Sequence, residues 1–96
     1  MKIGDIKEGD RKIDLTAEVT EKSEAREAVS KYTNETFRIA SATIEDSTGH
    51  MVLNLWNEQI EMVRVGDTVK IENGYVKAFR DVLQLNSGKY GTLTVV

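Results

Sequence analysis

Tyr75, Lys77 and Phe79 place two aromatic rings on either side of a cation at two-residue spacing. Residues spaced in this way on a β-strand project from the same face, about 7 Å apart. This distance is close to the separation of successive bases in an extended single strand, and stacking one base on an aromatic ring contributes about 1 to 3 kcal/mol whatever the base. The only tryptophan, Trp56, ends another alternating segment. The three rings therefore predict a base-stacking surface.

The phase of each segment predicts that these rings lie outside the core. In the predicted strand 50–56 the apolar phase belongs to residues 51, 53 and 55, which leaves Trp56 on the outer face. After Gly74 the core phase is expected to be Val76 and Ala78, so the rings of Tyr75 and Phe79 point outward. Small polar residues share the outer phase and predict a shallow cleft beside the rings. They are Ser41, Thr43 and Asn54.

Packing is the competing interpretation of every aromatic residue. A single ring near a strand end more often packs under a loop than stacks on a ligand, but the shared outer phase of the three rings favours binding for the set. For Phe37 and Tyr32, which lie near the hairpin arm, clamping of that arm and stacking on a ligand both stay open, with clamping at least equally favoured, and Tyr90 is expected to cover a barrel end. Among the cations, Lys77 and Arg80 are predicted to contact phosphates, followed by Arg26 on the arm.

Five alternating segments must position these residues. They are Lys12–Thr20, Thr36–Glu45, His50–Trp56, Thr68–Phe79 and Val82–Asn86. The phase changes at Gly74 inside the fourth segment, which predicts a β-bulge or a sharp bend. Residues 21–31 fit either a helix or a long hairpin arm, and their position favours the arm. Asn57 is expected to cap a helix of about two turns that carries Ile60 and Val63 and ends by Gly66. This order predicts an all-β OB-fold: a five-stranded Greek-key barrel with a short helix between strands three and four.

Composition limits the other possibilities. Ninety-six residues fit one domain, 1–96, and the absence of cysteine together with a single histidine excludes thiolate or multi-histidine metal sites. Asp46, Ser47 and His50 lie within one turn and lack the strand-to-helix elbow of a nucleophile, so neither an enzyme nor a cofactor is expected. The net charge of −3 gives no general attraction to a polyanion, which must be held locally. No apolar run reaches membrane-spanning length, and a cytoplasmic, nucleoid-associated protein is expected.

Several strings of residues resemble a known family, the short single-OB single-stranded DNA-binding proteins of archaea and the OB domains of archaeal replication protein A. The resemblance covers residues 4–88. It is carried by Leu55-Trp56, by Gly66-Asp67-Thr68-Val69-Lys70-Ile71-Glu72-Asn73-Gly74-Tyr75, by Ala78-Phe79-Arg80 and by Leu83-Gln84-Leu85-Asn86, with support from Ser23-Glu24-Ala25-Arg26 and Asp46-Ser47-Thr48-Gly49. It implies that Trp56, Tyr75 and Phe79 stack DNA bases and that Arg80 and Arg26 match family basic residues. Relatives usually have glycine where this chain has Asp81, and single-OB relatives carry a long C-terminal tail.

The predicted function is single-stranded DNA binding with little sequence preference, in replication, recombination or repair. Two alternatives stay open at this point: an RNA-binding OB module, because stacking does not distinguish the sugars, and an OB domain whose rings dock a peptide. The expected partners are single-stranded DNA, other replication or repair proteins, and sister OB domains if the chain is one module of a longer protein.

Overall fold

β-strands dominate the chain, as the alternating segments predict. The computed structural model describes residues 1–88 and 90–96. Its elements are the 3-10 turn η1 (Ile3–Asp5), β1 (Ile13–Lys22), β2 (Arg26–Val29), β3 (Thr36–Asp46), β4 (Gly49–Trp56), α1 (Gln59–Met62), β5 (Thr68–Phe79), β6 (Val82–Asn86) and β7 (Thr92–Val95). The ends of all five predicted strands lie within two residues of those observed, and the limits of β5 and β6 coincide with the prediction.

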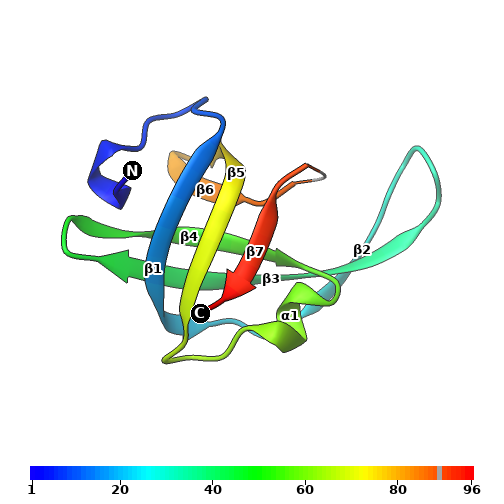
Figure 1. Ribbon diagram of the computed structural model, residues 1–96. Coiled ribbons are helices and arrows are strands. Elements are labelled where there is room, and N and C mark those ends of the chain that lie inside the picture. Colours follow the sequence, from blue (N-terminus) through cyan, green and yellow to red (C-terminus); the bar gives the residue numbers. More distant parts are fainter. Residues whose placement is uncertain (89) are drawn as a thin grey trace.

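Five strands form a closed circuit (Figure 1). β1 pairs with β3, β3 with β4, β4 with β6, β6 with β5, and β5 returns to β1. The β4–β6 pair is parallel and the other four are antiparallel. α1 follows β4, and β7 adds to the free edge of β5. The predicted all-β OB-fold is confirmed.

The core fills the inside of this circuit. Every strand of the circuit contributes fully buried members, because one phase of each alternation points inward, and Val63 joins them from the residue after α1. The largest are Ile13, Val19, Ile44, Leu53, Leu55, Val63, Val69, Ile71 and Leu85. Ile3 and Ile6 add to the core from the N-terminal segment.

Gly74 lies at a β-bulge, as the phase change predicts. Ile13 pairs with Gly74 but Leu15 pairs with Ile71, so β5 has one extra residue opposite β1, and Asn73 takes a φ of 55°. A Cβ on Gly74 would lie 2.9 Å from the Cγ2 of Ile71 and 3.0 Å from the carbonyl oxygen of Asn86. Only glycine fits this close approach of β5 to β6, and the bulge turns Tyr75 to the outer face.

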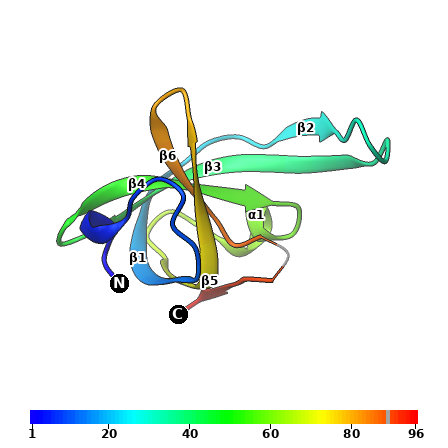
Figure 2. The ribbon, with the colours of Figure 1, turned by 90° about the horizontal axis from the view of Figure 1, so that it is seen from above.

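Residues 21–31 form the hairpin arm and not a helix. β2 pairs antiparallel with the first half of β3, from Arg26 opposite Ile39 to Val29 opposite Thr36. Figure 2 shows the arm extending away from the strand circuit. Residues that pair from β2 to β3 and from β3 to β4 form rows across the sheet, and one such row runs from Arg26 through Ile39 to Trp56.

Three details of the sequence prediction are wrong. The helix is a single turn, and Asn57 does not cap it: Asn57 takes a φ of 51° and its Oδ1 accepts a hydrogen bond from the Arg38 backbone N–H. The ammonium of Lys22 donates to the carbonyls of Ile60 and Val63 and closes the end of the turn. Ala78 is exposed, because the β5–β6 hairpin continues past the end of the core.

Candidate nucleic-acid interface

One face of the sheet carries the predicted site residues in adjacent rows. The outer phases of β3, β4, β6 and β5 lie side by side in that order, and we call their surface the outer face. Its members are Ile39, Ser41, Thr43, Val52, Asn54, Trp56, Gln84, Asn86, Tyr75, Lys77 and Phe79. The three predicted rings thus point away from the core, which was the geometric premise of the stacking hypothesis.

Trp56 is held on three sides at the end of β4. Its indole Nε1 donates to Asn86 Oδ1 at 3.1 Å, and its backbone N–H donates to Gln59 Oε1 at 3.1 Å. The ring centroid lies 5.2 Å from that of Phe37, with the planes tilted by 43°. The ring is half-buried, so part of its surface stays open to a ligand while its orientation is fixed.

Buried amides lie beneath this ring. Asn54, which the sequence placed in an open cleft, is buried, and its Nδ2 donates to Gln84 Oε1 at 3.0 Å and to Asn86 Oδ1 at 3.2 Å. Sequence reasoning missed Gln84 and Asn86 as site residues. The signal was available, because both alternate with Leu83 and Leu85 and therefore share the outer phase.

Tyr75 lies beside Trp56 across a hollow. A pocket of about 420 Å³ is lined by Trp56, Asn57, Glu58, Gln59, Tyr75, Ser87 and Gly88. Gln59 Nε2 donates to Ser87 Oγ at 2.7 Å, which joins α1 to the segment after β6. The pocket therefore has one aromatic ring on each side and polar groups from two elements in its lining, which suits a flat heterocycle with polar edges.

The Tyr75 ring packs on the backbone of Gly88. A Cβ at Gly88 would lie 2.6 Å from Tyr75 Cε1, so the ring occupies the place where any other side chain would begin. On the opposite side, Lys77 Nζ lies 5.8 Å from the Tyr75 ring centroid, within reach of a cation–π contact.

Phe79 and Arg80 lie at the end of the β5–β6 hairpin. Phe79 is 59% exposed, and the guanidinium carbon of Arg80 lies 5.3 Å from its ring centroid. The two-residue turn places Arg80 at a φ of 51° and Asp81 at 64°, the pattern of a type I′ turn. Asp81 thus adopts the left-handed conformation for which relatives are expected to use glycine.

Arg26, Ser41 and Thr43 do not line the two pockets that Tyr75 borders. Arg26 is exposed and pairs with Ile39, which pairs with Trp56, so Arg26 lies in the row that leads to the tryptophan. Ser41 and Thr43 line a separate pocket of about 210 Å³ with residues of β1.

The other aromatic predictions have mixed outcomes. Phe37 packs on Trp56 and belongs to the ring cluster, a role that the sequence did not identify. Tyr32 is 98% exposed at the tip of the arm and clamps nothing there. Tyr90 is 82% exposed, so the expectation that it covers a barrel end is wrong.

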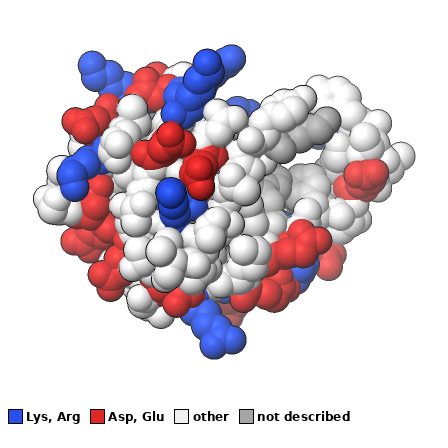
Figure 3. Space-filling model, in the orientation of Figure 1, with Lys and Arg blue, Asp and Glu red and all other residues white. Residues whose placement is uncertain are grey.

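Charges of both signs are mixed over the face shown in Figure 3. Within residues 1–88 and 90–96, the ion pairs are Arg38–Glu61 and Lys70–Glu72, and no group of three or more acidic or histidine side chains could hold a metal. The Arg38 side chain lowers the pKa of Glu61, with which it forms a hydrogen bond. No helix in this described part of the chain is long and apolar enough to cross a bilayer.

Comparisons with known proteins agree with this geometry. A family model described as "Single-stranded DNA binding protein Ssb-like, OB fold" matches residues 11–95. The single-stranded DNA binding protein Ssb of Saccharolobus solfataricus is 37% identical over 87 residues, which cover 91% of this chain and 57% of that protein. The chain therefore spans less than two thirds of that relative's length.

Two solved structures show the same fold. The second OB-fold domain of replication protein A from Methanococcus maripaludis has a TM-score of 0.79 at 23% identity, with 100% of this chain and 95% of that chain covered. A replication protein A heterotrimer bound to single-stranded DNA has a TM-score of 0.81 at 17% identity, with 99% of this chain and 24% of that chain covered. At these identities the likeness establishes the arrangement of strands.

Proposed function

The chain belongs to the Ssb-like family of OB-fold single-stranded DNA-binding proteins, and on that premise we propose that it binds single-stranded DNA with little sequence preference. Residues 1–96 act in this proposal as a single OB-fold domain without enzymatic activity. The relative from Saccharolobus solfataricus carries single-stranded DNA binding in its name.

The observation that supports the proposal is the common direction of three rings. Trp56 and Tyr75 face one pocket from β4 and β5, and Phe79 continues the same phase of β5 by four residues. Each ring offers one base a flat surface, and since every base has a π face this binding is tolerant of sequence. We expect the strand to cross the outer face from the β5–β6 hairpin toward the arm.

Phosphate contacts are proposed for Lys77, Arg80 and Arg26. Each side chain is exposed and lies at or next to one of the rings or in the row that leads to Trp56. When three phosphates of a single strand are neutralised, the logarithm of the binding constant falls with the logarithm of the salt concentration with a slope of about −2. Asp81 next to Arg80 weakens the contact at the hairpin end.

Trp56 fluorescence tests the proposal directly, because the ring is half-buried and belongs to the proposed surface. We expect oligo-dT to quench it, RNA of the same length to quench it less, and duplex DNA of that length not to quench it. Equal quenching by RNA would indicate an RNA-binding module. No quenching by either single strand at low salt would contradict nucleic-acid binding and favour a peptide as the ligand of the rings.

The cellular role follows from the substrate. Single-stranded DNA arises in replication, recombination and repair, and we propose that the chain protects or organises it at the nucleoid with other replication or repair proteins. Sister OB domains are a further proposed partner. Co-purification of the full-length native polypeptide with nucleoid DNA, sensitive to single-strand nuclease, tests this role.

A further inference from the structure

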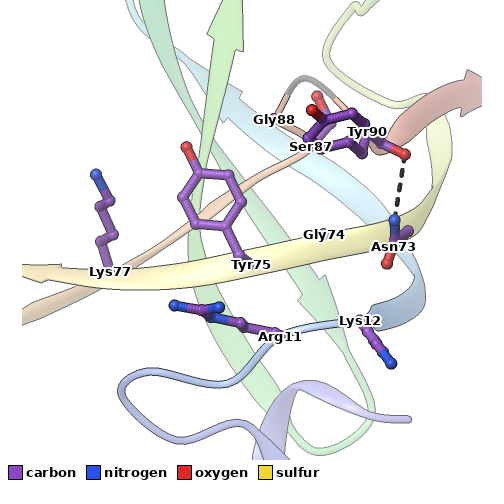
Figure 4. Close-up of a pocket in the computed structure, with 9 residues that line it drawn as sticks. All are labelled: Arg11, Lys12, Asn73, Gly74, Tyr75, Lys77, Ser87, Gly88 and Tyr90. Carbon is purple, nitrogen blue, oxygen red and sulfur yellow. Dashed lines mark hydrogen bonds between the residues drawn. The ribbon is translucent and has the colours of Figure 1, made fainter.

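Tyr75 also lines a second pocket, and neither Trp56 nor Phe79 belongs to its lining (Figure 4). Its volume is about 450 Å³, and its lining includes three cations, Arg11, Lys12 and Lys77, but no carboxylate. In a chain of net charge −3, three cations around one hollow are a local concentration of positive charge.

The backbone fixes Arg11 and Lys12 opposite Tyr75. The carbonyl of Asp10 accepts a hydrogen bond from the Val76 N–H at 2.9 Å, and Ile13 pairs with Gly74. Arg11 and Lys12, which lie between these two contacts, are therefore opposite Tyr75 on β5. Lys12 takes a φ of 54° at the bend. The pocket is thus built by the start of β1 meeting the bulge of β5.

The cations of this pocket have no ion-pair partner within the described part of the chain. The neighbouring carboxylates are engaged elsewhere: Asp10 Oδ2 accepts the Lys7 N–H at 2.8 Å, and Asp14 Oδ1 accepts the Asn73 N–H at 3.0 Å. Figure 4 shows the Arg11 guanidinium directed along β5 between Tyr75 and Lys77, whereas Lys12 points away from the ring.

We propose that this pocket binds the phosphodiester group of the nucleotide whose base stacks on Tyr75, with Arg11 and Lys77 as its phosphate ligands and Lys12 at the rim. The inference rests on the proposed function. A guanidinium presents a planar fork of donors that matches two phosphate oxygens, and the ammonium of Lys77, 5.8 Å from the centroid of the same ring, adds a second cation. Arg11 thereby adds a phosphate contact that the alternation of the strands does not reveal.

The test compares the salt dependence of oligo-dT binding for the wild type, Arg11→Gln, Arg11→Lys and Arg64→Gln. Arg64 is a matched control, because it is equally an exposed arginine but lies in the loop before β5, at the opposite end of that strand. For Arg11→Gln we expect the slope of log binding constant against log salt concentration to be less negative by about 0.7. Its affinity should then be about eightfold below that of the wild type at 50 mM salt, and the two affinities should converge near 1 M. Arg11→Lys should keep the wild-type slope, and so should Arg64→Gln.

The outcomes distinguish a failure of the pocket assignment from a failure of the proposed function. Arg11 is exposed and its side chain makes no hydrogen bond to residues 1–88 or 90–96, so the thermal unfolding of Arg11→Gln should match that of the wild type. If Arg11→Gln and Arg64→Gln share the wild-type slope while oligo-dT still quenches Trp56, the pocket assignment is overturned and the proposed function stands. If oligo-dT fails to quench Trp56 in the wild type itself, the proposed function fails and the pocket assignment fails with it.

Discussion

The side-chain oxygen of Asn86 accepts a hydrogen bond from the indole Nε1 of Trp56 at 3.1 Å. The same oxygen accepts Asn54 Nδ2 at 3.2 Å, and Asn86 is only 3% exposed. One buried amide on β6 therefore sets the rotation of the tryptophan ring on β4. A ring that is already immobilised loses less side-chain entropy when a base stacks on it, so Asn86 acts as a positioning residue for the proposed interface.

Asn86→Ala removes this shared acceptor. Because the indole N–H of Trp56 then lacks a partner and the buried Asn54 amide keeps only its bond to Gln84, we expect the free energy of unfolding in urea to fall by about 1 to 3 kcal/mol. Oligo-dT affinity should fall as well, since Trp56 is free to rotate. Gln84→Ala is the matched control, because it removes an acceptor of Asn54 but leaves the Trp56 bond in place. Equal losses of affinity in the two variants would contradict the positioning role.

Phe79→Ala separates binding from folding. Phe79 is 59% exposed on a hairpin beyond the core, so its removal should change the free energy of unfolding by less than about 0.5 kcal/mol. Loss of one stacking surface should weaken oligo-dT binding by about 1 to 3 kcal/mol. Titrations followed by Trp56 fluorescence, together with urea denaturation, measure both quantities. Unchanged affinity would remove Phe79 from the interface.

The strands and the direction of the rings were predictable because they depend on alternation alone. Trp56, Tyr75 and Phe79 oppose the aliphatic phase in sequence, and Gly74 marks the shift of phase within β5. Ala78 was misassigned because alternation gives the side of a strand but not where the core beneath it ends. Asn57 was misassigned as a cap because its side chain is engaged by Arg38 from β3, a tertiary contact that no local pattern reveals.

The missing parts of the site all depend on contacts between distant segments. Phe37 meets Trp56 only because β3 and β4 pair in one particular register. Arg11 reaches Tyr75 because the start of β1 pairs across the bulge of β5. Residue type and spacing identified the stacking chemistry, whereas the groups that orient each ring required the three-dimensional arrangement.

Gly88→Ala tests the support of Tyr75. Gly88 has a φ of 67°, and a Cβ there would lie 2.6 Å from Tyr75 Cε1, so the new methyl group must displace the ring from its place between the two pockets. We expect weaker oligo-dT binding and a lower melting temperature, the latter because alanine is strained at this φ. Gly9→Ala is a useful control: Gly9 also has a positive φ, of 84°, but nothing lies within 4 Å of the added Cβ. If both variants lose stability but bind equally well, the support of Tyr75 by Gly88 has no role in binding.

Asp46 links stability to acid pH. Its Oδ2 accepts the backbone N–H of Ile3 at 2.8 Å, and its Oδ1 accepts the hydroxyl of Thr48 at 2.5 Å and the backbone N–H of Thr48 at 2.7 Å. These bonds, the one from Ile3 foremost and the Thr48 hydroxyl next, lower the pKa of Asp46 from 3.8 to about 2. A carboxyl group whose pKa is lower in the folded state binds its proton more readily when unfolded, so its stabilising effect is present above about pH 4 and is lost as the pH falls toward 2. Because Ile3 belongs to the core, the bond also fastens η1 to the β3–β4 turn. We expect Asp46→Asn to melt at a lower temperature than the wild type at pH 6 and the difference to shrink between pH 4 and pH 2, as measured by circular dichroism. A difference that stays constant over this range would show that the charge of Asp46 does not hold the N-terminal segment.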